Sequence, residues 1–202
     1  MHPVIGIDFG TTNSVVAALR PDGGVATLDH AAGAVFRSVL CLWLEQGRTR
    51  HAAGPAAIDA YLEDPLASRL IMSMKSYLAQ RSFRETRIHG RGWTLEALVA
   101  TFLRELLAPF GADLRGARIV VGRPVRFAGE TAEDAFGEER LRAAFADAGL
   151  PGVTVALEPA AAGHRSGRRP RRRHQRLLPP AVRAGAATPR HAARACGGRH
   201  RG

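Results

Sequence analysis

A short segment near the N-terminus combines residue types that bind phosphate and a divalent cation. Asp8 stands at the end of an apolar, β-branched stretch, where a carboxylate can hold a hydrated Mg²⁺. Gly10 lets the backbone turn tightly, and Thr11 and Thr12 with the N–H groups of the turn supply donors to phosphate oxygens. The full string D-F-G-T-T-N-S between β-branched flanks favours a phosphate-binding turn over an ordinary glycine-containing hairpin.

Alternating strands and helices are predicted to position this turn. Apolar runs bounded by turn formers predict strands at residues 4–7, 15–19, 25–28, 117–122 and 153–157, and a stretch buried on both faces at residues 36–44. Helical character is predicted at residues 55–80, 95–110 and 130–148, the second helix with Thr94 as N-cap and Gly111 as its end. Strands followed by strand–helix alternation indicate an α/β fold.

Together with three later segments, the N-terminal string resembles the heat-shock protein 70 (DnaK-type) chaperones of the actin-like ATPase superfamily. The later segments follow in the family's order and spacing, around Lys75, at residues 119–127 and at residues 158–162. The resemblance covers residues 4–163.

Two short segments are more similar to one divergent bacterial subgroup of this family, the YegD-like proteins. They are Gly-Arg-Pro at residues 122–124 and Ser-Val-Leu-Cys at residues 38–41. One residue departs from the family pattern, because Arg37 stands where the family usually has proline before serine. The sequence therefore does not predict the backbone conformation at residue 37.

The resemblance implies a fold, a ligand and a role for each matched residue. The implied fold is an incomplete actin-like (ribonuclease-H-like) ATPase lobe, and the implied ligand is ATP with Mg²⁺. Asp8 would hold the Mg²⁺ through its water shell, Lys75 would offset charge on the transferred phosphoryl group, and Glu158 would orient the attacking water. The phosphates would be bound by the turn residues Gly10, Thr11, Thr12 and Asn13. The implied partners are unfolded client polypeptides and co-chaperones, and the implied location is the cytoplasm.

The charge of the chain divides it into two parts. Residues 1–163 carry 16 Arg and one Lys against 18 acidic residues, whereas residues 164–202 carry 12 Arg and no acid. The second part contains two Leu, one Val and no other large apolar residue, which is too little to offset the entropy of ordering a chain. We therefore predict a lobe over residues 1–163 and a disordered basic tail over residues 164–202.

The tail stands where the family has its second phosphate motif, D-x-G-G-G-T-x-D. With GC-rich codons, residues 167–179 read one base later as V-A-D-L-G-G-G-T-S-D-F-S-L, which contains that motif. The tail is therefore interpreted as out of frame, and the chain as a truncated chaperone ATPase that is expected to be inactive in ATP hydrolysis.

Two other functions remain open, and several classes are excluded. The alternatives are a fragment of an actin-like filament-forming ATPase, and a protein whose arginine-rich arm binds RNA. Cys41 and Cys196 lie in dissimilar segments, which indicates neither a disulfide framework nor a metal cluster. We expect no secretory signal, because the N-terminus has no basic region followed by an apolar stretch, and no membrane span, because no apolar run is long enough. We also expect no specific nucleic-acid partner, because the net positive charge is confined to the tail.

Overall fold

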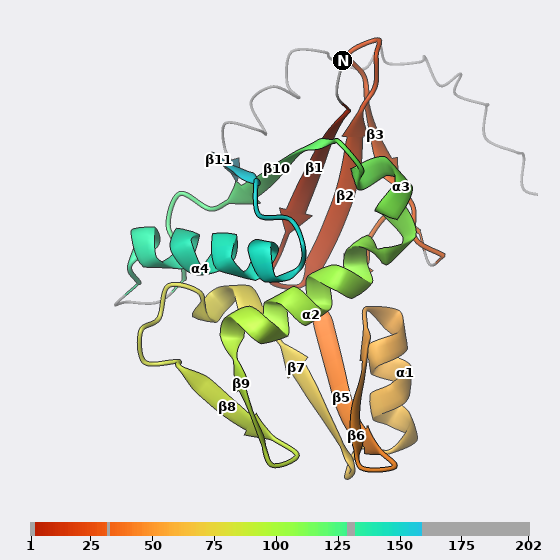
Figure 1. Ribbon diagram of the computed structural model, residues 1–202, viewed down its shortest axis with the longest axis vertical. Coiled ribbons are helices and arrows are strands. Elements are labelled where there is room, and N and C mark those ends of the chain that lie inside the picture. The colour runs from red at the N-terminus through yellow and green to blue at the C-terminus, as the bar shows by residue number, and fades with distance from the viewer. Residues whose placement is uncertain (1–2, 32, 129–131, 159–202) are drawn as a thin grey trace, which may run out of the picture. The chain divides into compact units, whose positions relative to one another are not determined.

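The main sheet carries the N-terminal turn at one end of a central strand. The computed structural model describes residues 3–31, 33–128 and 132–158. The strands of this sheet are β1 (Val4–Phe9), β2 (Asn13–Leu19), β3 (Val25–Leu28), β4 (Phe36–Arg37), β10 (Arg118–Arg123) and β11 (Thr154–Leu157). They are ordered β11-β10-β1-β2-β3, with β4 also paired to β2 (Figure 1).

Strand direction brings three strand ends to one edge of this sheet. β1 is antiparallel to β2 but parallel to β10, and β10 is parallel to β11. The carboxyl ends of β1, β10 and β11 therefore lie at the same edge, which is where parallel sheets place ligand-binding groups.

A second, antiparallel sheet and a hairpin lie between β4 and β10 in the sequence. The sheet has the order β6-β5-β7 and consists of β5 (Val39–Glu45), β6 (Arg48–Ala53) and β7 (Ser68–Met72), and α1 (Pro55–Glu63) contacts all three strands. The hairpin pairs β8 (Glu85–Ile88) with β9 (Arg91–Thr94). Residues 39–42 of β5 are all buried, so the predicted burial of both faces of this stretch is confirmed there.

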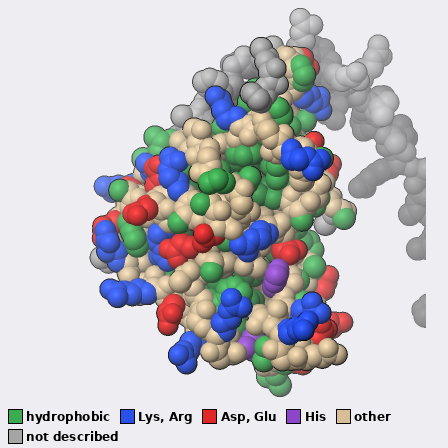
Figure 2. Space-filling model, viewed as in Figure 1, with side chains coloured by type: hydrophobic (Ala, Val, Ile, Leu, Met, Phe, Trp, Pro, Cys, Tyr) green, Lys and Arg blue, Asp and Glu red, His purple; other side chains and the backbone are tan. Residues whose placement is uncertain are grey.

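Two long helices lie side by side between the sheets (Figure 1). They are α2 (Leu95–Leu107) and α4 (Asp134–Asp147), and short helical turns form η1 (Met74–Tyr77), η2 (Ala108–Phe110) and α3 (Gly111–Leu114). The predicted N-cap of α2 is confirmed, because the Thr94 hydroxyl accepts a hydrogen bond from the Ala97 N–H at 3.2 Å. Figure 2 shows acidic and basic side chains interspersed over this face of the molecule.

The prediction of helix over residues 55–80 is wrong after Glu63. Pro65 disfavours helical geometry at the residue before it, and the backbone of Asp64 is not helical (φ −145°, ψ 83°). The Asp64 side chain accepts a hydrogen bond from the Ala67 N–H. The chain then enters β7, whose pairing with β5 outweighs its modest helical propensity. Gly111 also does not end the helical run, which continues through η2 into α3.

The mixed α/β class is confirmed by these sheets and helices. The predicted tail at residues 164–202 lies outside the described residues, as does residue 163, where the predicted lobe ends. Within the described part of the chain, no helix is both long enough and apolar enough to cross a membrane.

Candidate functional site

The turn after β1 depends on the absence of a side chain at Gly10. A Cβ placed there would lie 2.1 Å from the backbone oxygen of Asn13, because the chain folds back on itself within three residues. Thr11, Thr12 and Asn13 are exposed, and within the described residues no hydrogen bond engages their side chains. The turn therefore presents three uncommitted polar side chains to a ligand.

A second segment braces this turn from behind. The Ser38 N–H donates to the backbone oxygen of Thr12 at 2.9 Å, and the buried hydroxyls of Ser14 and Ser38 are 2.9 Å apart. Arg37 pairs with Asn13 in the β2–β4 ladder, so the backbone left open at that position is a short strand. These contacts hold the ends of the turn in place.

Lys75 and Glu158 meet in an ion pair, although 83 residues separate them. The Lys75 ammonium donates to Glu158 Oε1 at 2.6 Å, with 8% of the Lys75 side chain and 38% of the Glu158 side chain exposed. Lys75 is presented by η1, and Glu158 directly follows β11. The partly exposed member of this pair is the carboxylate, so Glu158 is the group that a cation or a water molecule can reach from solvent.

The Asp8 carboxyl shares this environment. It lies at the carboxyl end of β1 and is exposed by surface area, yet desolvation by the surrounding protein raises its pKa. The positive charge of Lys75 acts in the opposite direction and lowers the pKa of Asp8, and the negative charge of Glu158 raises it. The three predicted residues Asp8, Lys75 and Glu158 are thus brought together.

Gly122 makes room for Glu158, a role that the sequence reasoning missed. A Cβ on Gly122 would lie 3.2 Å from Cγ of Glu158, closer than most side chains tolerate. Gly122 pairs with Ala156 in the β10–β11 ladder, so it stands beside the strand that directly precedes Glu158. A glycine inside an apolar strand is a signal of close approach, and it was available in the sequence.

Arg140 fixes the segment that carries Lys75, and this too was not predicted. The Arg140 side chain, 5% exposed, forms an ion pair with Glu96 and donates to the backbone oxygens of Tyr77 and Gln80, each at 3.4 Å. Burial raises the pKa of Glu96, but hydrogen bonding and attraction to Arg140 outweigh it and lower that pKa. One residue of α4 therefore ties the start of α2 to the end of η1.

The described residues contain no group of three or more His, Cys, Asp or Glu side chains that could hold a metal ion. Asp8 and Glu158 supply two carboxylates to this site. Mg²⁺ is commonly bound through one or two carboxylates, with water and phosphate oxygens completing an octahedron. The donor set therefore suits a cation that arrives with a phosphate ligand and not a protein-enclosed metal.

Part of the chain is similar to curated chaperones. It is 30% identical over 113 residues to the chaperone protein DnaK of Thermotoga neapolitana, and equally to that of Thermotoga maritima. Each of these matches covers 56% of this chain and 18% of the relative. It is 37% identical over 76 residues to a chaperone protein HscA homolog of Paracidovorax citrulli, covering 38% and 12%. No protein-family model matches the chain.

These relatives are chaperones of the heat-shock protein 70 type. The chain is similar to the DnaK proteins over about half of its length and to the HscA homolog over 38% of it, and it spans less than a fifth of the length of each relative.

Proposed function

We propose that this chain forms the phosphate side of a nucleotide site in a heat-shock-70-like chaperone ATPase and that it binds Mg-ATP. The observation that carries the proposal is the meeting of Asp8 with the Lys75–Glu158 ion pair. The exposed side chains of the turn at residues 11–13 add donors to the same proposed site. The partial similarity to DnaK and HscA proteins supports the same assignment.

Within the mixed α/β class, the arrangement of the main sheet supports the more specific proposal of an actin-like (ribonuclease-H-like) lobe. The chain between β10 and β11 contains α4, so these parallel strands are joined by a helical crossover. β1 and β11 thereby end at the same edge, where Asp8 and Glu158 lie. A shared edge is what a two-sided phosphate and metal site requires.

Each charged residue has a distinct proposed task. Mg²⁺ bound with ATP would neutralise phosphate charge and order water at Asp8. Lys75, whose side chain is buried, offers a positive charge in a fixed position for the transferred phosphoryl group. Glu158, partly exposed beside it, accepts a hydrogen bond from Lys75 and has capacity to orient a water molecule. Gly10 and the turn residues Thr11, Thr12 and Asn13 surround the phosphates.

We propose that this chain binds Mg-ATP without turnover. Phosphoryl transfer depends on groups that fix the nucleotide from more than one side. The sequence holds no D-x-G-G-G-T-x-D motif, and residues 168–173 are five Arg and one Pro at the place where it is expected. Reading the nucleotide sequence that encodes residues 158–180 tests the out-of-frame interpretation of this segment directly.

Calorimetric titration with Mg-ATP at physiological ionic strength tests the binding proposal. Salt at that level screens exposed arginine charges over about 8–10 Å, which suppresses nonspecific attraction. We expect a saturable, Mg²⁺-dependent signal that falls at least about tenfold in affinity in Asp8→Ala and in Lys75→Ala. The matched control is Asp59→Ala, which removes an exposed carboxylate of α1 and should leave binding unchanged.

The outcomes separate the parts of the proposal. Binding that is absent, or that all three variants share equally, contradicts the nucleotide site. ATP turnover that disappears in Lys75→Ala contradicts binding without turnover and shows that the described half-site hydrolyses ATP. Sedimentation that appears only with Mg-ATP would favour the filament-forming alternative.

Binding of client polypeptides and co-chaperones and a cytoplasmic location are proposed on the partial similarity alone.

A further inference from the structure

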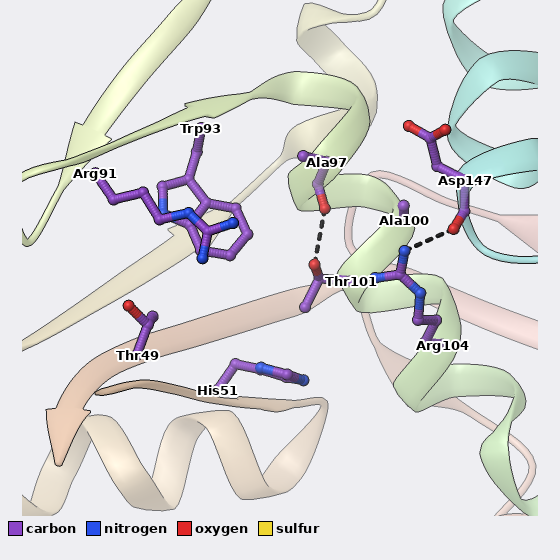
Figure 3. A pocket seen from close by; sticks show the side chains of 9 residues that line it. All are labelled: Thr49, His51, Arg91, Trp93, Ala97, Ala100, Thr101, Arg104 and Asp147. Carbon is purple, nitrogen blue, oxygen red and sulfur yellow. Dashed lines mark hydrogen bonds between the residues drawn. The ribbon is translucent and has the colours of Figure 1, made fainter. Parts of the chain in front are cut away.

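A pocket separate from Asp8, Lys75 and Glu158 opens where the second sheet, the β8–β9 hairpin and α2 come together (Figure 3). Its cavity measures about 440 Å³, within the size range of small-molecule sites. None of the residues assigned to nucleotide binding lines it. The pocket is therefore an independent candidate for a ligand.

The floor of the pocket is apolar because small residues repeat on one face of α2. Ala97 and Ala100 lie one turn apart on that face. The Thr101 hydroxyl donates its hydrogen bond to the Ala97 carbonyl at 2.8 Å, so this hydroxyl is not available as a donor to a ligand (Figure 3). The Trp93 ring, 8% exposed, forms part of the wall. An apolar body of modest size can therefore lie on this floor.

Three basic side chains from three elements stand around this floor. Arg91 of β9 lies over the Trp93 ring, with its guanidinium carbon 4.9 Å from the ring centroid. Arg104 of α2 donates to the backbone oxygen of Asp147 at 2.6 Å, and His51 of β6 is 3.1 Å from a Glu105 carboxylate oxygen.

The two guanidinium groups are not neutralised by an ion pair. In the described part of the chain, neither Arg91 nor Arg104 forms a salt bridge. The acid in the lining is Asp147, whose carboxylate points away from Arg104 in Figure 3. Like charges around one concave, partly apolar surface focus a positive potential into it.

We infer that this pocket binds small organic anions, meaning a carboxylate or phosphate group attached to an apolar body. The planar fork of a guanidinium matches both oxyanions with paired hydrogen bonds, and two such forks border one cavity. The apolar body packs on Ala97 and on the accessible part of Trp93. This site is distinct from the proposed nucleotide site, so either assignment can fail without the other.

The indole N–H signals in ¹H–¹⁵N spectra of the full chain provide the test. The chain has two tryptophans, and Trp43→Phe identifies the signal of Trp93. Benzoate and phenyl phosphate are titrated at physiological ionic strength, with benzamide as the neutral isostere. We expect saturable shifts of the Trp93 signal with one or both anions and none with benzamide, and the comparison of the two anions shows which oxyanion the site prefers.

Matched arginine variants assign the effect to the pocket. Arg91→Gln and Arg104→Gln each remove an exposed guanidinium and should weaken binding about tenfold. Arg87→Gln is the control, because Arg87 pairs with Gly92 and thus faces the side of the hairpin opposite to Arg91 and Trp93. The inference is overturned if no anion shifts the Trp93 signal saturably, if benzamide shifts it equally, or if all three variants behave alike.

Discussion

Replacing Gly10 with alanine tests whether the shape of the phosphate turn requires a missing side chain. The new Cβ would lie 2.1 Å from the Asn13 carbonyl oxygen, whereas contacts of real Cβ atoms essentially never fall below 3.0 Å. The turn must therefore open by about 0.9 Å, the difference between these two distances. Since the opposing atom belongs to the backbone, no change of side-chain rotamer relieves the contact.

The cost follows from what holds the turn closed. Forcing an extra carbon into a tight contact costs about 1–3 kcal/mol. Opening also weakens the 2.9 Å hydrogen bond from the Ser38 N–H to the Thr12 oxygen, a net contribution of about 1 kcal/mol. We expect Gly10→Ala to lower the free energy of unfolding by about 2–4 kcal/mol.

Gly6→Ala is the matched control, because Gly6 lies in β1, the strand that leads into the turn. A Cβ on Gly6 meets no atom closer than the Ala17 oxygen at 3.9 Å, which is an ordinary contact. The control should change stability by no more than about 1 kcal/mol in either direction. Urea unfolding followed by circular dichroism measures both variants. Equal unfolding midpoints for Gly10→Ala and Gly6→Ala would refute the steric reasoning.

Three further predictions concern charge. Desolvation raises the pKa of Asp8 in the folded state above 3.8, so ionisation of Asp8 destabilises the fold as the pH rises from 3.8 through the folded pKa. Asp8→Asn should therefore increase the free energy of unfolding at pH 7 but not below pH 3.8. Urea titrations at both pH values test this. Lys75→Met removes the attraction that lowers the pKa of Asp8, so this pKa should rise further in a ¹³C carboxyl titration, and a fall would contradict the charge geometry. Arg140→Met should cost about 3 kcal/mol at pH 7, because it leaves Glu96 unpaired. Arg50→Gln, which breaks an exposed ion pair with Glu45, should cost less than about 1 kcal/mol. The lowered pKa of Glu96 means that the Arg140 effect is present above pH 4.5 and disappears as the pH falls through the folded pKa. An effect that does not decrease at any pH below 4.5 would argue against the ion pair.

The parts of the fold that follow from local chemistry could be predicted from the sequence. The apolar run before Asp8 and the capping hydroxyl of Thr94 each act within a few residues, and both appear in the structure as β1 and α2. The prediction failed at β7, because its partner strand β5 is distant in the sequence and the pairing is not visible in local propensity.

The same distinction between local and long-range contacts applies to the residues of the candidate site. Lys75 and Glu158 were selected through a family resemblance, and the composition around them gave no reason to pair them. Burial of Lys75 depends on how η1 packs, and Arg140 reaches that segment from a helix 60 or more residues away. Such long-range contacts leave no periodic signature in one sequence. Gly122 was the exception, since an isolated glycine in an apolar strand already indicates close approach.

The ion pair between Lys75 and Glu158 also has a consequence for the order of folding. Closing a contact across 83 residues requires β10, α4 and β11 to be in place first, so Glu158 reaches Lys75 late. The pairing of β1 with β2, in contrast, involves strands that are neighbours in the sequence. During synthesis, the turn at Gly10 can therefore form before its charged partners have left the ribosome. Pulsed hydrogen exchange during refolding should protect amides of β1 and β2 before those of β11, and simultaneous protection would show that the strands assemble in one step.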